Sequence, residues 1–89
     1  MARTVLNQTL SGGGASYTVP ASKVAIFAAH LGNSGGGAPV LQFGSDPVAV
    51  LGAGVSEAKP LVAAAGTVIS VTGVGSTGKI SLSGFLYDV

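Results

Sequence analysis

Residues 79–87 read KISLSGFLY, and the character of the side chains alternates along this segment. Successive side chains of a β-strand point to opposite faces, which places four aliphatic or small residues on one face: Ile80, Leu82, Gly84 and Leu86. The other face changes from polar to aromatic towards the C-terminus: Lys79, Ser81, Ser83, Phe85 and Tyr87. The segment is therefore predicted to be a strand that turns its aliphatic face to a core and presents Phe85 and Tyr87 to a partner.

Short segments rich in Val, Ile, Leu, Thr and Phe recur along the whole chain, separated by turns that contain Gly or Pro. This pattern is typical of strands rather than helices. Eight strands are predicted, at Arg3–Leu10, Ser16–Val19, Lys23–Leu31, Pro39–Phe43, Val48–Leu51, Lys59–Ala63, Thr67–Thr72 and Lys79–Tyr87. We expect an all-β fold of one domain over residues 1–89, a compact β-sandwich or jelly roll of about eight short antiparallel strands.

The segment Lys23–Leu31 differs from the others because both of its faces are largely apolar. Val24, Ile26, Ala28 and His30 alternate with Ala25, Phe27, Ala29 and Leu31. A two-layer sandwich can bury only one face of a strand within a single chain. We therefore expect burial on both faces, with the second face covered by another subunit.

Charged residues are scarce: seven of 89 residues, or 8%, where soluble domains average about 25%. The net charge is +1, and the mean hydropathy is +0.64. With no Cys and a single His, neither disulfides nor a zinc site is expected to support so small a core. The composition predicts a subunit that packs against copies of itself or against a larger assembly.

Several functional classes are not favoured. The uncharged stretches at 4–22, 24–45 and 60–78 are interrupted by Gly, Ser, Thr, Asn or Pro, so no membrane span is expected, and no apolar signal segment follows Arg3. Four basic and three acidic residues without a basic run predict no nucleic-acid partner.

The stretch Gly73–Lys79 spells G-x-G-x-x-G and most of a phosphate-binding loop. Phosphate loops require Ser or Thr after the Lys, where Ile80 stands, and both motifs require a following helix. Residues 80–89 alternate as a strand instead. This stretch is therefore interpreted as a glycine-rich hairpin loop, and no cofactor is expected.

His30 is the sole imidazole, and one of the ten serines could in principle use it as a general base. A catalytic triad also needs an orienting acid and an oxyanion site, and no spacing in the sequence suggests either. We expect no enzymatic activity, no catalytic residue and no metal site, with His30 in a structural role.

Three stretches resemble small structural proteins of tailed bacteriophages: Tyr17–Ala25, the loop Gly32-Asn33-Ser34, and Gly78–Phe85. In that group similar strands occur in β-sandwich subunits on the virion surface. The resemblance implies a jelly-roll subunit, commonly a homotrimer, that clamps neighbouring major capsid proteins at local three-fold positions. It implies no catalytic residue.

Residues 1–10 precede the first glycine run and are predicted to be either the first strand or an arm that lies on a capsid neighbour. The predicted interface residues are Arg3, Val5, Leu6, Leu10, Phe85 and Tyr87. The leading hypothesis is a capsid decoration, or cement, subunit on the virion surface, with itself and the major capsid protein as partners.

Two alternatives remain open at this point. One is a head-fibre or tail component that recognises a receptor through loops such as residues 32–37. The other is a small carbohydrate-binding module in which Phe85 and Tyr87 stack on a sugar.

Overall fold

The computed structural model describes residues 3–12, 14–33, 39–51, 57–73, 75 and 77–89, with the backbone alone for residues 57–59. All regular elements in these residues are strands. The eight strands are β1 (Arg3–Ser11), β2 (Ser16–Thr18), β3 (Lys23–Asn33), β4 (Val40–Phe43), β5 (Asp46–Val50), β6 (Glu57–Ala63), β7 (Val68–Thr72) and β8 (Lys79–Asp88). The predicted all-β class is confirmed.

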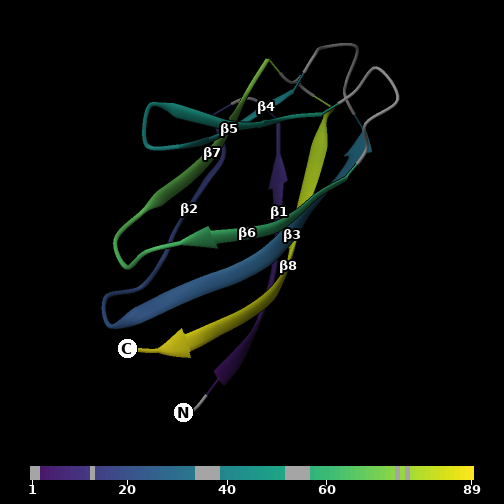
Figure 1. The fold of residues 1–89 in the computed structure, drawn as a ribbon. Helices are drawn as coiled ribbons and strands as arrows, with labels where there is room; N and C mark the ends of the chain where they lie inside the picture. The colour runs from purple at the N-terminus through teal and green to yellow at the C-terminus, as the bar shows by residue number, and fades with distance from the viewer. Residues whose placement is uncertain (1–2, 13, 34–38, 52–56, 74, 76) are drawn as a thin grey trace.

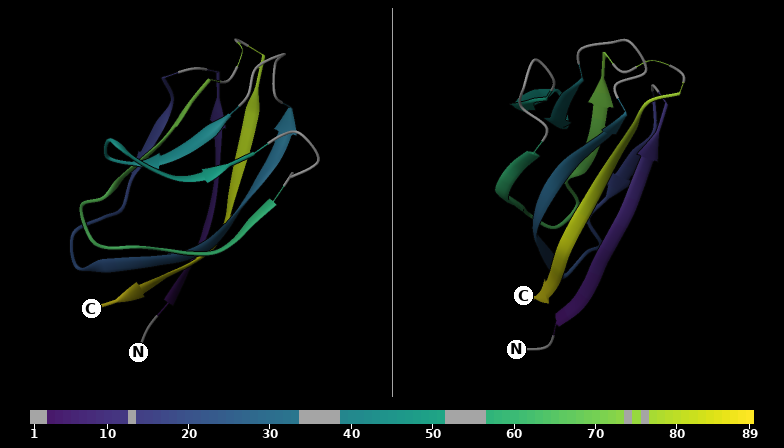
Figure 2. Two further views of the ribbon diagram at one scale, coloured as in Figure 1. Left: turned by 45° about the horizontal axis from the view of Figure 1, so that its top comes forward. Right: turned by 90° about the vertical axis from the view of Figure 1, so that its right-hand side faces the viewer.

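The strands form two antiparallel sheets of four strands each, packed face to face (Figures 1 and 2). Sheet A has the order β1-β8-β3-β6, and sheet B has the order β2-β7-β4-β5. Strands β1, β3 and β8 are long and run side by side, with the beginning of β1 and the end of β8 at the same end of the molecule (Figure 1). Sheet A is thus a continuous surface that spans most of the length of the sandwich.

The main correction to the predicted strands concerns Asp46 and Pro47, which were expected in a turn. The structure places both in β5, and the turn shrinks to Gly44 and Ser45, because Phe43 pairs directly with Asp46. Gly44 has a φ of 64°, as the first position of a two-residue type II′ hairpin turn requires, and its N–H donates to the carbonyl oxygen of Val68 at 2.8 Å. Of the other predicted turns, 52–54 lies outside the described residues, and so do parts of 11–14, 32–37 and 73–78.

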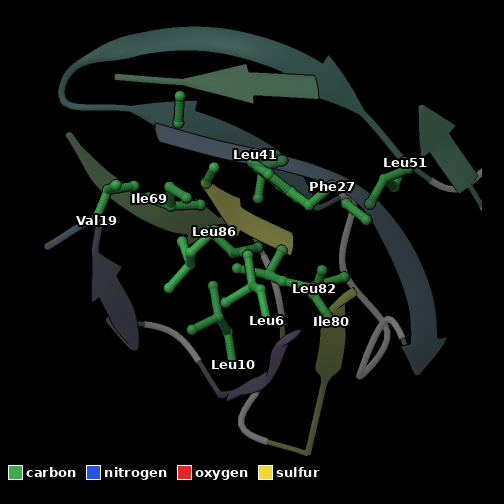
Figure 3. Packing of buried hydrophobic residues seen from close by; sticks show 14 residues of the cluster. Leu6, Leu10, Val19, Phe27, Leu41, Leu51, Ile69, Ile80, Leu82 and Leu86 are labelled. Carbon is green, nitrogen blue, oxygen red and sulfur yellow. The ribbon is translucent and has the colours of Figure 1, made fainter. Parts of the chain in front are cut away.

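The core lies between the two sheets and consists of aliphatic side chains with few aromatics (Figure 3). Phe27 of β3 and Phe43 of β4 link the two layers, with ring centroids 6.1 Å apart and planes inclined at 45°. Offset and tilted ring pairs are the favourable geometry. No polar or charged residue is buried within the described part of the chain, so apolar burial and strand pairing carry the stability of the fold.

Strand β3 is buried on one face only within a single chain. Ala25, Phe27 and Ala29 lie in the core, whereas Ile26 on the opposite face is 39% exposed. The core face is confirmed, and the second face, which was predicted to be covered by another subunit, is the outer face of sheet A in the single chain.

Gly84 allows β8 and β3 to approach closely. It lies opposite Phe27 in the register, and a Cβ atom built on it would lie 2.6 Å from Phe27 Cα and closer still to the carbonyl oxygen of Ile26. Real Cβ atoms do not come this near to backbone atoms, which cannot move aside as a flexible side chain can. Glycine is therefore required at this position by space rather than by dihedral angle.

We predict that Gly84→Ala lowers the free energy of unfolding by about 1–3 kcal/mol, because the added methyl group forces the two central strands apart. Urea denaturation followed by circular dichroism measures the loss. Ser83→Ala, at an exposed position on the same strand, is the control and should stay within about 0.5 kcal/mol of wild type. Equal stabilities for the two variants would contradict the packing argument.

Ser22 is the one described non-glycine residue with a positive φ, 66°. It is the third residue of the turn that leads into β3, closed by a hydrogen bond from Lys23 N–H to the Pro20 carbonyl oxygen at 3.2 Å. Turns that need a positive φ at this position favour Gly, since a side chain there costs about 1 kcal/mol.

We predict that Ser22→Gly raises the thermal midpoint modestly, with a gain of about 0.5–1 kcal/mol in the free energy of unfolding, as the left-handed strain is removed. Ala21→Gly in the same turn is the control. It should destabilise the fold, because it adds unfolded-state freedom without relieving strain. A Ser22→Gly variant that melts lower than wild type would show that the strain is compensated in the native turn.

Candidate interaction surface

An apolar row crosses the outer face of sheet A from one edge to the other. Val5, Phe85, Ile26 and Val62 lie opposite one another in the strand register, on β1, β8, β3 and β6 in turn. Val5 is 68% exposed, Val62 59% and Ile26 39%, while Phe85 is half-buried. We call these four residues the apolar row; it presents large apolar side chains to solvent from every strand of the sheet.

Arg3 and Tyr87 border the apolar row on the side nearest the chain ends. The guanidinium carbon of Arg3 lies 4.6 Å from the centroid of the Phe85 ring, which is cation–π geometry. The rings of Phe85 and Tyr87 are 6.2 Å apart and inclined at 56°. Because the rings are tilted rather than coplanar, they form a compact ridge and not a flat stacking platform.

The outer face of sheet A becomes polar towards its other end. Beyond the apolar row, Asn7 pairs with Ser83 and then Thr9 with Ser81, and the last pair joins Ser11 to Lys79. The face therefore has two halves: an apolar half beside the chain ends and a hydroxyl-rich half beneath the opposite loops.

The predicted interface residues divide into two groups. Arg3, Val5, Phe85 and Tyr87 lie together on the outer face, as the alternation of the last strand predicted for the two aromatic residues. Leu6 and Leu10 do not: they are 2% and 4% exposed and point into the core (Figure 3). Both residues lie on the opposite face of β1 from Val5, so their side chains are not part of the outer surface of the folded chain.

Residues 3–11 form a strand rather than a detached arm. Strand β1 pairs with β8 over all nine residues without a break in register. Its inward side chains complete the core, so the first-strand alternative describes this part of the chain.

Ile26 and Val62 were not among the predicted interface residues. The signal for Ile26 was present, since both faces of its strand were predicted to be apolar. Val62 lies next to Leu61 and Ala63 in a uniformly apolar run, so its outward orientation follows only from the pairing of β6 with β3.

His30 lies on the outer face of sheet A, where the register places Ser81 of β8 on one side and Glu57 of β6 on the other. These are the residue types of a triad, an arrangement that the sequence did not reveal. However, Ser81 belongs to β8, which is paired on both sides, so its neighbouring backbone amides are engaged in the sheet and cannot form an oxyanion hole.

Within the described residues, no group of three or more His, Asp or Glu side chains is placed to hold a metal ion. None of the described elements is a helix long and apolar enough to cross a membrane. Comparison with known proteins gave no matching family model, curated protein or solved structure.

We predict that Arg3 and Phe85 are energetically coupled. A double-mutant cycle with Arg3→Gln and Phe85→Leu should give a coupling of about 0.5–1 kcal/mol in the free energy of unfolding, the usual value for an exposed cation–π pair. The control cycle combines Arg3→Gln with Val62→Ala. Val62 lies in β6, at the opposite edge of sheet A from Arg3, so this cycle should give a coupling near zero. Equal values from the two cycles would mean that the contact contributes nothing.

Proposed function

We propose that this chain is a non-enzymatic structural subunit of a bacteriophage virion, specifically a capsid decoration or cement protein. It is located on the capsid surface, assembles as a homotrimer and binds the assembled major capsid protein. It requires no cofactor, nucleic acid or membrane.

The strand order supports a jelly roll as the finer description of the sandwich. Strands β1, β8, β3 and β6 make one sheet and β2, β7, β4 and β5 the other, so every connection but one passes from one sheet to the other. Eight strands wound in this alternating way are the arrangement of jelly rolls, a fold common in viral capsid and lectin domains.

The observation that carries the proposal is the apolar row. Four large apolar side chains from four strands are aligned on an open sheet face, in a chain that is only 8% charged. Contiguous exposed apolar surface marks sites of protein association. A protein that binds only the assembled shell stabilises it by mass action, and this requires surface complementarity rather than chemistry.

The apolar row supplies the surface that we assign to the shell contact. Arg3 and Tyr87 at its border are residue types enriched at the centres of protein interfaces. Covering this face would also complete the burial of β3 that its doubly apolar sequence predicts.

The first test is binding to capsid shells of the parent phage that lack the protein. Val62→Lys places a charge in the apolar row and should reduce binding at least about tenfold, since an unpaired charge in a desolvated contact costs more than 1.4 kcal/mol. Val50→Lys is the matched control, because Val50 is 65% exposed but lies in β5 of the other sheet. Co-sedimentation with shells measures both.

Light scattering of the purified protein tests the oligomer. A mass near three times 8.5 kDa across a dilution series is expected for the trimer.

Failure of the wild type to bind shells, with binding to host cells or glycans instead, would overturn the decoration role in favour of the receptor-binding or carbohydrate-binding alternative.

A further inference from the structure

Among the edge strands that the structure describes, β1 has the least protected free edge. Each sheet has two edge strands: β1 and β6 in sheet A, and β2 and β5 in sheet B. An edge strand presents unpaired backbone N–H and C=O groups that can pair with another chain, and proteins usually block it with Pro, bulges, charges or short length.

Three of the four edges carry such a block. Strand β2 has only three residues, β5 contains Pro47 and a register shift in its pairing with β4, and β6 contains Pro60. Strand β1 has nine residues without Pro, with one charged side chain, Arg3, at its very start. Its pairing with β8 has no bulge, and β8 is the one strand paired with it in the described part of the chain.

We infer that β1 pairs antiparallel with β1 of a second copy across a two-fold axis at Asn7. In this register all nine residues find a partner, with Val5 opposite Thr9 and Arg3 opposite Ser11 of the other copy. Because the axis passes through Asn7, the pairing opposes no like charges. Directly opposed residues share a face, so both outward rows stay outward and both core rows stay inward.

The proposed pairing cannot add a third copy of the chain. It would join two four-stranded sheets into one of eight strands, bounded at both outer edges by β6 with Pro60. An isologous contact uses the same surface on both partners and leaves nothing to propagate. The chain can therefore keep an open edge without forming fibres.

The inferred contact needs only a second copy of the chain, and it stands whether or not the shell contact exists. Its place in an assembly does rest on the proposed function. A trimer has no internal two-fold axis, so β1 pairing would link subunits of neighbouring trimers across the local two-fold axes that lie between three-fold positions on a shell.

Cysteine cross-linking tests the register directly, because the chain contains no Cys. In Asn7→Cys the two thiols lie opposite each other, within the Cα separation of about 4.4–6.8 Å that a disulfide needs. In Thr9→Cys, at an equally exposed position on the same face, the two thiols are roughly 14 Å apart, four residues along the strand. Mild oxidation should give a covalent dimer with Asn7→Cys and essentially none with Thr9→Cys.

A pair of charge variants gives an independent measurement by sedimentation at high protein concentration. Asn7→Lys brings two ammonium groups together at the axis and should abolish the association, whereas Thr9→Lys faces Val5 and should retain it. Circular dichroism verifies that both variants fold.

Equal cross-linking at positions 7 and 9, or association unaffected by Asn7→Lys, would overturn the inferred pairing. Neither result bears on shell binding, which Val62→Lys tests through a different surface. Loss of shell binding with intact Asn7→Cys cross-linking would reject the decoration role and leave the β1 contact in place.

Discussion

The structure depends on the central position of β8, which pairs along its whole length with β1 on one side and β3 on the other. Those three strands hold most of the buried side chains of sheet A, and β8 is the last of the eight strands along the chain. Gly84 is the point at which this arrangement is sterically tightest, because the backbone of β3 occupies the space that any side chain would need. The register of the outer face, including the apolar row, follows from this contact between two backbones.

The sequence allowed the number of strands and most of their limits to be predicted, because Gly and Pro separate segments with clear alternation. Pairing order could not be predicted, since alternation along one strand contains no information about its neighbours; Val62 became part of the apolar row only through that order. The alternation along the last strand correctly placed Phe85 and Tyr87 on its outward face. Leu6 and Leu10 were predicted to be anchors of an arm, but they alternate with Val5 along a paired strand, and their side chains therefore point into the core. Asp46 and Pro47 were misplaced because a two-residue turn needs only Gly44 and Ser45.

Charge contributes little to holding this fold together. The ion pair between Lys23 and Asp88 joins the start of β3 to the end of β8, but both side chains are partly exposed, and such pairs are worth about 0–1 kcal/mol. The stabilising terms are apolar burial between the sheets and the backbone ladders within them. Both extend to the surface, as the apolar row and as the open edge of β1, so the interactions that fold the chain are also those it offers to other molecules.

The two ends of the chain leave the sandwich at the same pole, because Arg3 pairs with Tyr87 and the N–H of Val89 donates to the carbonyl oxygen of Ser22 at 3.0 Å (Figure 1). A tag or a displayed peptide fused to either end would therefore emerge near Arg3 and Phe85, beside the apolar row. The Gly44–Ser45 hairpin belongs to the other sheet and has two exposed residues at its tip. For a cargo-bearing version of this protein, an internal insertion at that hairpin would place the cargo on the other sheet and leave the apolar row uncovered.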